Sequence, residues 1–348
     1  MCEHVFVRWQ NLSVDVEDPQ RPLPKLGDGA VVRTFDAPEA LGIRFHEVRA
    51  KSALNKVHPA ARMPFNWTVN PYRGCGHACT YCFARRTHTY LDLNAGRDFE
   101  REIVVKVNVP EKLRAELARP SWKREGVALG TNTDPYQWVE SRYKLMPEIW
   151  RALLDHDTPG SLVTKSPLVL RDLPMLQELA AGPGFQAFLS VPTLDERAWR
   201  ETEPHTPSPR ARIQAVRKLN DAGVPAGVLI APLMPGVNDT PEEVAEIVRL
   251  ADEAGATSIG AVALHLRGEV KDVFFEWLRE RRPELLERYA KLYEKGAYLP
   301  SDERRRLQEL ASVPRRKRRR KPPPPARGPK AEREPPARTP EPKQHTLF

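Results

Sequence analysis

The sequence predicts an α/β fold, a full or partial TIM-type (β/α)6 barrel, from three observations. Short apolar runs alternate with amphipathic stretches from about residue 65 to 281, and polar residues follow several of the runs. The length of 348 residues suits one barrel of about 250 residues with extensions. Because repeated strand–helix units place their strands in parallel with right-handed crossovers, six or seven such units would curl into a barrel. An open doubly wound sheet is the alternative.

Seven apolar runs are the expected strands. Each is short and rich in Val, Ile, Leu or aromatic residues, as buried strands are, and helical patterns separate most of them. In chain order the runs are NWTVN (66–70), EIVVKVN (102–108), GVALG (126–130), SLVTK (161–165), FQAFLS (185–190), PAGVLIA (225–231) and SIGAVALHL (258–266). Barrel enzymes carry their sites where polar residues follow such strands, at the carboxyl-terminal rim.

One helix has well-defined predicted ends. Thr240 is a good N-cap, Pro241 suits the first helical position, and Glu243 can reach back to complete a capping box. Gly255 follows the last residue of the amphipathic pattern and can take the left-handed conformation that ends a helix. The sequence therefore predicts a helix from Pro241 to just before Gly255.

The chain divides into three expected segments. Residues 1–64 are interrupted by prolines, and we expect them to wrap over the barrel, with a short strand at GIRFHEV (42–48). Residues 65–313 form the barrel domain. Residues 314–348 contain ten prolines, with 12 Lys and Arg against 3 Asp and Glu, which accounts for the whole net charge of +9. This composition predicts a disordered basic tail.

The cysteines indicate a reducing compartment. Cys2 stands alone, whereas the other three cysteines lie together in NPYRGCGHACTYCFAR (70–85), which is unlike a disulfide framework. No charged start followed by an apolar stretch opens the chain, and no apolar run approaches the ~18 residues that span a bilayer. We therefore expect a cytoplasmic protein with no membrane partner.

Cys75, Cys79 and Cys82 have the spacing C-x3-C-x2-C. Three thiolates on one loop can hold three irons of a cubane cluster and leave the fourth iron open to a small molecule. Gly74 and Gly76 permit the positive φ values and close backbone approach that a loop around a cluster requires. A zinc site that uses the three cysteines with His77 or His88 is the alternative, although zinc loops favour C-x2-C pairs.

The same residues resemble the radical S-adenosylmethionine superfamily, whose signature C-x3-C-x-(aromatic)-C is matched by Cys75, Cys79, Tyr81 and Cys82. The resemblance is to a group related to spore photoproduct lyase and covers most of residues 45–280. It runs through FHEVRAKSALNKV (45–57), GTNTDPYQ (130–137), VTKS (163–166), SVPTLDE (190–196), GVLIAPLMPGVND (227–239) and ALHLRGEV (263–270).

The resemblance implies a barrel of the radical S-adenosylmethionine type and its cofactors. A [4Fe-4S] cluster would pass one electron, from a reductant such as a flavodoxin or ferredoxin, to S-adenosylmethionine, which splits into methionine and a 5′-deoxyadenosyl radical. That radical would take a hydrogen atom from the substrate. Because S-adenosylmethionine would occupy the fourth iron through its amino and carboxylate groups, no fourth cysteine would be needed.

The resemblance also implies roles for individual residues. Cys75, Cys79 and Cys82 would hold the irons, and Tyr81 would lie beside the adenine. Thr131, Asn132 and Thr133 would meet the methionine amino group, and Lys165 and Ser190 would contact the methionine carboxylate and the ribose. On simpler interpretations Tyr81 is a core aromatic, Lys165 is a solvated rim lysine, and Asp134 with Pro135 turns the chain and caps the next helix.

Asn132 marks a departure from spore photoproduct lyase. Alignment of GTNTD (130–134) places Asn132 where that lyase has a hydrogen-donating cysteine. An amide cannot return a hydrogen atom to a substrate radical as a thiol can, so the sequence identifies no hydrogen donor and no catalytic residue beyond the cofactor site.

The tail suggests two partners. The seven basic residues from Arg315 to Lys321 could bind DNA phosphates without sequence preference, although they could equally serve only solubility. The ending QHTLF resembles the Gln-x-x-Leu-Phe peptide that docks into the bacterial sliding clamp, with Gln344, Leu347 and Phe348 as the matching residues.

The sequence therefore predicts a radical S-adenosylmethionine enzyme that acts on DNA or a nucleotide lesion. Radical modification of a protein or small metabolite is the first alternative. A non-catalytic, zinc-stabilised adaptor that binds the sliding clamp is the second.

Overall fold

The main sheet is a partial barrel. The computed structural model describes residues 12–13, 31–40, 42–61 and 63–312. Six parallel strands lie in sequence order, and the antiparallel strand β4 (Leu54–Lys56) pairs with the first of them. The six strands are β5 (Trp67–Val69), β8 (Val127–Leu129), β9 (Gly160–Thr164), β10 (Phe185–Ser190), β11 (Ala226–Leu233) and β12 (Ile259–Ala263). Among the described strands, β12 and β4 form the two edges, so the barrel is partial rather than closed.

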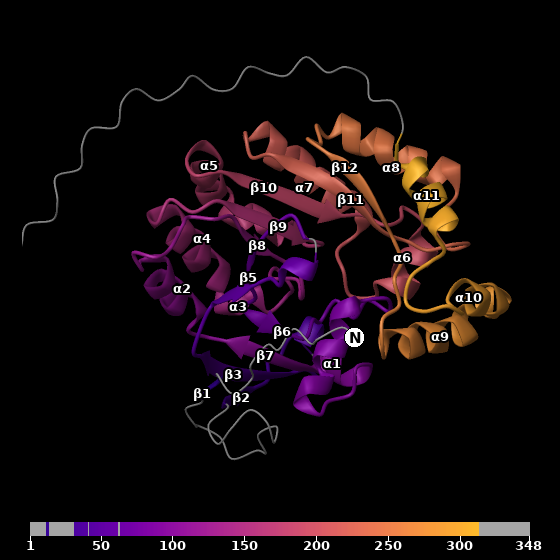
Figure 1. Cartoon of the computed structure of the whole chain (residues 1–348), viewed down its shortest axis with the longest axis horizontal. Coiled ribbons are helices and arrows are strands. Elements are labelled where there is room, and N and C mark those ends of the chain that lie inside the picture. Colours follow the sequence, from indigo (N-terminus) through magenta and orange to yellow (C-terminus); the bar gives the residue numbers. More distant parts are fainter. Residues whose placement is uncertain (1–11, 14–30, 41, 62, 313–348) are drawn as a thin grey trace, which may run out of the picture. The chain divides into compact units, whose positions relative to one another are not determined.

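Helices connect the parallel strands and cover the sheet (Figure 1). In α4, the side chains of Ile149, Trp150 and Leu153 recur at helical spacing and are fully buried, which explains why this amphipathic stretch packs onto the strands. The connecting helices are α3 (Glu140–Tyr143), α4 (Leu145–Asp155), α5 (Leu173–Ala181), α6 (Glu196–Thr202), α7 (Pro209–Asp221) and α8 (Pro241–Glu253).

The segment after the barrel is helical. It contains α9 (Val270–Arg281), η7 (Pro283–Leu285), α10 (Leu286–Leu292) and α11 (Ser301–Leu310). Short 3-10 helices lie elsewhere, at η2 (Pro38–Ala40), η3 (Pro59–Ala61), η4 (Phe83–Thr87), η5 (Thr89–Leu91) and η6 (Pro167–Asp172). Among the described helices, none is both long and apolar enough to cross a bilayer.

A second, smaller sheet lies beside the first (Figure 1). Strand β3 (Arg44–Ala50) confirms the expected strand at GIRFHEV, and it pairs in parallel with β7 (Glu102–Lys106). The run EIVVKVN is therefore a strand, but it belongs to the small sheet, not to the barrel. Its partner comes from the N-terminal segment, a pairing that periodicity within one run cannot reveal. The other members are β1 (Leu12–Ser13), β2 (Val31–Arg33) and β6 (Tyr72–Arg73), and helices α1 (Arg97–Arg101) and α2 (Val109–Leu117) flank β7 in sequence.

Helix α8 confirms the predicted ends but not the full capping box. The Thr240 hydroxyl accepts a hydrogen bond from the Glu243 N–H at 3.3 Å, and Gly255 has a φ of +79°. The Glu243 carboxylate accepts instead from the Thr193 hydroxyl and from the Leu194 N–H at 3.2 Å. Glu243 thus ties the start of α8 to the loop that follows β10.

The predicted disordered tail, residues 314–348, lies outside the described residues, and so do two predictions made within it. These are the basic run from Arg315 to Lys321 and the terminal peptide with Gln344, Leu347 and Phe348.

Candidate functional site

The cysteine loop follows β6 and leads directly into η4. Cys75 and Cys79 are buried, Cys82 is partly buried, and all three carry free thiols. The Cys75 N–H donates to the Phe99 carbonyl at 3.0 Å, which fixes the start of the loop against α1. Cys82 is the N-cap of η4, so the last thiol marks the point where the loop ends.

The loop requires glycine at position 74 but not at position 76. Gly74 has a φ of +82°, and a Cβ there would lie 2.9 Å from the Phe99 carbonyl oxygen. A Cβ on Gly76 would come no closer than 3.6 Å to Ile43, an ordinary contact, and Gly76 does not have a left-handed φ. The left-handed residue within the loop is Ala78, with a φ of +55°. The expectation for Gly74 is therefore confirmed, and that for Gly76 is wrong.

Arg85 binds the backbone of the cysteine loop. Its guanidinium is almost fully buried and donates to the carbonyls of Cys79 at 2.9 Å and Ala78 at 3.0 Å. It also donates to the carbonyls of Ala95 and Gly96 and pairs with the carboxylate of Glu100. One arginine thus satisfies several buried acceptors that a tightly turned loop would otherwise leave without partners.

Gln137 holds the loop from the side of the barrel. Its side-chain oxygen accepts from the Gly76 N–H at 3.0 Å, and its side-chain nitrogen donates to the Gly74 carbonyl at 3.1 Å. The residue is buried and belongs to the segment after β8. Sequence reasoning did not single it out, although it ends the GTNTDPYQ motif.

The donor set suits an iron–sulfur cluster. Burial raises the pKa of Cys75 to about 12, with nearby Asp134 and Cys82 adding to the effect. Burial and Glu203 raise the pKa of Cys79, and burial raises that of Cys82. Thiols with raised pKa values need a nearby cation to become thiolates, and a bound metal would supply it. The chemistry of Cys75, Cys79 and Cys82 is therefore compatible with thiolate ligation of an iron–sulfur cluster.

The two histidines considered as alternative zinc ligands make other contacts. His88 Nε2 lies 2.9 Å from the Glu102 carbonyl oxygen, and the ring packs edge-on against Phe99 at 5.2 Å. His77 is buried, with Nδ1 3.5 Å from the Asp134 carboxylate. Among the described residues, no three of His, Cys, Asp and Glu are grouped as ligands of a single metal ion.

Asp134 joins the ends of two barrel strands. Its carboxylate accepts from the Thr164 hydroxyl and the Lys165 N–H, both at 2.7 Å, and from the Tyr136 N–H at 2.9 Å. The contact with Tyr136 is the turn that an Asp-Pro pair predicts. The other two contacts fix the segment after β8 against the end of β9, because Thr164 is the last residue of β9 and Lys165 directly follows it.

Lys165, Ser190 and Tyr81 lie together at this rim. Lys165 Nζ donates to the Ser190 hydroxyl at 2.9 Å and lies 5.7 Å from the centroid of the Tyr81 ring. The Lys165 side chain is only 16% exposed, so it is not a solvated rim lysine. Lys165 directly follows β9, Ser190 ends β10, and Tyr81 belongs to the cysteine loop. The structure thus brings together three of the residues that the sequence assigned to S-adenosylmethionine.

Glu203 and Arg212 organise this group, and sequence reasoning missed both. Glu203 accepts from the Tyr81 hydroxyl, lies 3.5 Å from Lys165 Nζ, and pairs with Arg212 at 2.6 Å. Both members of the ion pair are completely buried. Burial alone would raise the pKa of Glu203, but Arg212 and Lys165 hold it below the usual value. Neither residue lies in a motif, so only the tertiary fold reveals them.

The three residues after Gly130 have different surroundings. Thr133 is buried, and its hydroxyl donates to the Tyr72 carbonyl at 3.0 Å, which links the end of β8 to the start of the cysteine loop. Thr131 and Asn132 are partly exposed in the turn that follows β8. Gly130 opens this turn with a φ of +77°, and a Cβ there would collide with the Val163 carbonyl at 1.8 Å.

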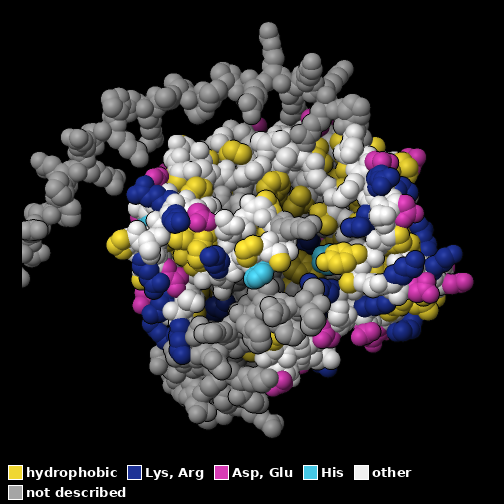
Figure 2. Space-filling model, viewed as in Figure 1, with side chains coloured by type: hydrophobic (Ala, Val, Ile, Leu, Met, Phe, Trp, Pro, Cys, Tyr) yellow, Lys and Arg dark blue, Asp and Glu magenta, His cyan; other side chains and the backbone are white. Residues whose placement is uncertain are grey.

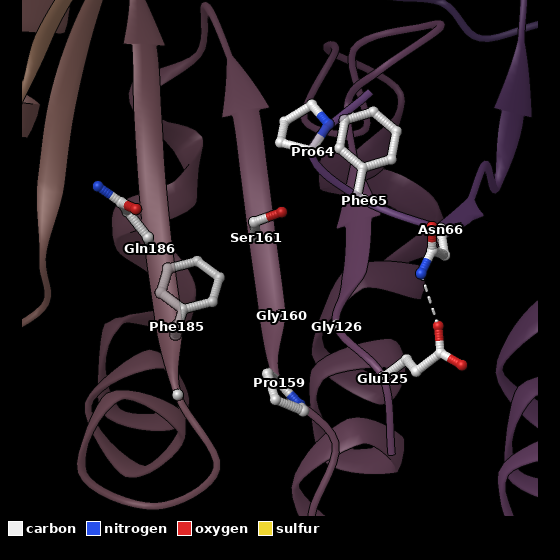
Figure 3. Close-up of a pocket in the computed structure, with 11 residues that line it drawn as sticks. Pro64, Phe65, Asn66, Glu125, Gly126, Pro159, Gly160, Ser161, Phe185 and Gln186 are labelled. Atoms are coloured by element: carbon white, nitrogen blue, oxygen red, sulfur yellow. Dashed lines mark hydrogen bonds between the residues drawn. The ribbon is translucent and has the colours of Figure 1, made fainter. Parts of the chain in front are cut away.

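A depression of about 530 Å³ lies at the opposite end of the sheet (Figure 3). It is lined by residues at the amino ends of β8, β9 and β10, including Gly126, Ser161 and Phe185. Asn66 and Glu125 on its wall are joined by a hydrogen bond of 2.9 Å. This depression lacks the cysteines and the polar strand ends, so it is separate from the candidate site.

A comparison with protein families gives one match. Residues 69–257 match the model of the radical SAM superfamily. The match begins in β5, includes the cysteine loop, and ends before β12.

Related sequences align with this chain, in part over a longer stretch than the family model covers. The chain is 46% identical over 306 residues to an uncharacterised protein of Mycobacterium tuberculosis and, to the same extent, to one of Mycobacterium bovis. Each alignment covers 87% of this chain and 90% of the relative. An uncharacterised protein of Methanocaldococcus jannaschii is 26% identical over 198 residues, covering 57% of this chain and 70% of that protein.

Solved structures share the fold. Spore photoproduct lyase complexed with dinucleoside spore photoproduct superposes with a TM-score of 0.53 at 16% identity, over 74% of each chain. A mutant of that lyase with bound AdoMet and the same dinucleoside gives the same TM-score, identity and coverage.

Proposed function

Because this chain belongs to the radical S-adenosylmethionine superfamily, we propose that it cleaves S-adenosylmethionine reductively at a [4Fe-4S] cluster and acts on DNA or a nucleotide lesion. The observation that supports cleavage of S-adenosylmethionine is the position of three free cysteines, two buried and one partly buried, on one loop beside the polar ends of the parallel strands. When bound, the cluster would supply one electron to S-adenosylmethionine and so yield methionine and a 5′-deoxyadenosyl radical.

The protein would hold the cluster and keep its loop rigid. Cys75, Cys79 and Cys82 would ligate three irons. Arg85 and Gln137 would fix the peptide groups between and around the thiols, so the thiolates would be oriented before the metal binds. A preorganised loop loses little conformational entropy when it takes up the cluster.

Lys165, Ser190 and Tyr81 would bind S-adenosylmethionine. The ammonium group of Lys165 would attract the methionine carboxylate, and the Ser190 hydroxyl would hydrogen-bond the ribose or the carboxylate. The Tyr81 ring would lie against the adenine. Glu203 would orient both Lys165 and Tyr81, because its buried carboxylate contacts each of them. Thr131, Asn132 and Thr133 would contribute to the amino-group end of the same site.

Three features support nucleic acid as the substrate. The lyase whose fold this chain shares has been crystallised with dinucleoside spore photoproduct. The run from Arg315 to Lys321 could neutralise phosphates. The terminal Gln344, Leu347 and Phe348 match a sliding-clamp peptide, which would bring the enzyme to replicating or repaired DNA. Because Asn132 replaces the hydrogen-donating cysteine, we propose a different final step from that of the lyase.

The enzyme would require a reductant and a reducing compartment. A small one-electron carrier such as a flavodoxin or ferredoxin would reduce the cluster. A cytoplasmic location would provide both that carrier and the reducing conditions that free thiols require.

Deuterium transfer tests whether DNA is the substrate. The anaerobically reconstituted enzyme is incubated with S-adenosylmethionine, a strong reductant, and deuterated DNA that is either damaged or undamaged. We expect deuterium in 5′-deoxyadenosine from the DNA substrate. Formation of 5′-deoxyadenosine without any deuterium from either DNA would reject DNA as the substrate and favour a protein or a small metabolite.

The terminal peptide has its own test. Replacement of Leu347 and Phe348 by alanine should abolish binding to the purified sliding clamp, because the clamp groove binds the two apolar side chains. A matched variant, His345→Ala, changes a variable position of the Gln-x-x-Leu-Phe motif and should bind normally. Equal clamp affinity of the double variant and the unchanged chain would show that the terminal resemblance is accidental.

A further inference from the structure

Three aromatic side chains contact one another in sequence near the carboxyl-terminal end of β12, with His265 between the other two. The rings of His265 and Tyr298 are stacked with centroids 5.8 Å apart and an interplanar angle of 24°. The ring of Phe83 lies 5.6 Å from His265 at 34°. We refer to Phe83, His265 and Tyr298 as the ring stack. Its members come from three separate parts of the chain, so the fold and not local sequence assembles it.

The backbone holds the ring stack in place. His265 and Tyr298 form an antiparallel β-bridge, and the Leu266 N–H donates to the Ala297 carbonyl at 2.8 Å. The Tyr293 hydroxyl donates to the Leu264 carbonyl at 2.8 Å and ties the same segment to the end of β12. Phe83 is the first residue of η4 and directly follows Cys82. The ring stack is therefore fixed next to the cysteine loop.

Two rings of the stack are exposed to a degree that is unusual for large apolar side chains. Phe83 is 44% exposed and Tyr298 is 56% exposed. Nearby, Val262 on β12 is also 44% exposed. Figure 2 shows hydrophobic side chains gathered near the middle of one face of the molecule, with histidine among them. Grouped exposed apolar side chains on a protein surface commonly mark a binding site.

A positive charge lies beside the stack. Arg267 follows His265 by two residues and is exposed. Burial of the ring lowers the pKa of His265, and the charge of Arg267 adds to the effect. Flat aromatic faces next to an arginine form the arrangement that binds single-stranded nucleic acids, where bases stack on rings and the cation meets the phosphate. Stacking tolerates any base, because every base has a π-face.

We propose that the ring stack of Phe83, His265 and Tyr298 binds an unpaired nucleobase of a nucleic-acid strand, with Arg267 at the adjoining phosphate. This inference rests on the proposed function and specifies how the substrate would be held. A base continues the stack most simply on the outer face of Tyr298, which has the largest exposed fraction of the three rings. Because Phe83 adjoins Cys82, a strand anchored there would lie beside the loop that holds the cluster.

The inference commits to a base rather than to an electron-donor protein. The rings of His265 and Tyr298 are within 24° of parallel, and that arrangement offers another flat ring an offset-stacked contact. An electron-donor protein that docked beside Cys82 would use the same exposed side chains, so its binding is measured as a separate outcome.

Quenching of 2-aminopurine fluorescence tests the inference, because stacking on an aromatic ring quenches this base. The reconstituted full-length protein is titrated against a short single-stranded oligonucleotide with one 2-aminopurine, at low and at high salt. We expect quenching with the unchanged protein, and about tenfold weaker binding with Tyr298→Ala, since the variant removes the ring on which the base would stack. The difference should persist at high salt, where the contribution of the basic tail is screened.

The matched control is Tyr298→Phe, which keeps the ring and should retain the affinity. Iron content and melting temperature of each variant exclude misfolding. Equal affinity of Tyr298→Ala and the unchanged protein, or no quenching at all, would overturn the inference. If Tyr298→Ala binds a flavodoxin more weakly but binds the oligonucleotide as the unchanged protein does, the inference is also overturned. The surface would then be assigned to the electron donor. Failure of the unchanged protein to cleave S-adenosylmethionine would instead reject the proposed function, whatever the oligonucleotide does.

Discussion

Gln137 brackets Cys75 through the two peptide groups on either side of it. The side-chain amide accepts from the Gly76 N–H at 3.0 Å and donates to the Gly74 carbonyl at 3.1 Å. Both Gly74 and Gly76 adjoin Cys75, so a single side chain fixes the backbone from which the first thiol projects. Because Gln137 comes from the segment after β8, it also fixes the loop relative to the barrel.

The first prediction concerns Gln137→Ala. Loss of two hydrogen bonds, each worth about 1 kcal/mol, should free the backbone around Cys75 and weaken retention of the cluster by about tenfold or more. Iron and sulfide per chain, measured over time with a chelator present, test this directly. Gln177→Ala is the control, because Gln177 donates a similar bond of 2.8 Å to the Ala222 carbonyl, away from the loop. Equal iron loss in the two variants would remove Gln137 from the site.

The second prediction concerns S-adenosylmethionine affinity. Lys165→Ala removes the ammonium group at the rim and should weaken binding by about tenfold to a hundredfold, as expected for a hydrogen bond to a charged group. Equilibrium dialysis with the reconstituted protein measures the affinity, and iron analysis confirms that the cluster is present. Lys218→Ala, at an exposed position on α7, is the control. Normal affinity of Lys165→Ala would show that this lysine does not contact the cofactor.

The third prediction concerns the buried pair of Glu203 and Arg212. Glu203→Gln would leave the Arg212 charge buried without its counter-ion, so we expect a loss of about 3–5 kcal/mol in the free energy of unfolding. Glu196→Gln breaks an exposed pair with Arg200 and should change it by less than about 0.5 kcal/mol. Urea denaturation under anaerobic conditions compares the two. Similar losses in both variants would mean that the buried pair does not stabilise the fold.

The fourth prediction concerns Lys106 and pH. Burial, with Arg73 nearby, lowers the pKa of Lys106 to about 7, from 10.5 for an ordinary lysine. The folded chain therefore binds fewer protons than the unfolded chain between those two values, so stability should rise as the pH is raised above 7. Below pH 7 both states are protonated at this position and the dependence should disappear.

Lys106→Met isolates this effect. The free energy of unfolding of the unchanged protein should increase by about 1–2 kcal/mol more between pH 7 and pH 9 than that of the variant. Lys218→Met, at an exposed position, controls for loss of a charge alone. Identical pH dependence of the unchanged protein and Lys106→Met would contradict the effect of burial.

Local patterns were sufficient to predict much of the barrel. Apolar runs such as FQAFLS and PAGVLIA became adjacent parallel strands, because their hydrophobic side chains must be covered on both faces. The cap by Thr240 and the left-handed Gly255 were likewise set by residues next to each other in the chain. The run EIVVKVN was recognised as a strand but assigned to the barrel, because its partner β3 lies far away in the sequence.

The candidate site was also only partly predictable from the sequence. Lys165, Ser190 and Tyr81 were identified from motifs and do lie together. Glu203, Arg212 and Gln137, which hold them or the cysteine loop, were not identified. Glu203 and Arg212 lie outside any motif, and the position of Gln137 at the end of GTNTDPYQ does not reveal that its side chain reaches the cysteine loop. Their roles arise from contacts between segments that are far apart in the chain.

The most direct test is formation of 5′-deoxyadenosine by the anaerobically reconstituted protein with S-adenosylmethionine and dithionite. We predict about four iron and four sulfide ions per chain and clear 5′-deoxyadenosine formation. Neither should occur at a comparable level in Cys75→Ala, Cys79→Ala or Cys82→Ala. Zinc in place of iron with no 5′-deoxyadenosine, or equal product from the three cysteine variants, would contradict a radical mechanism at this loop.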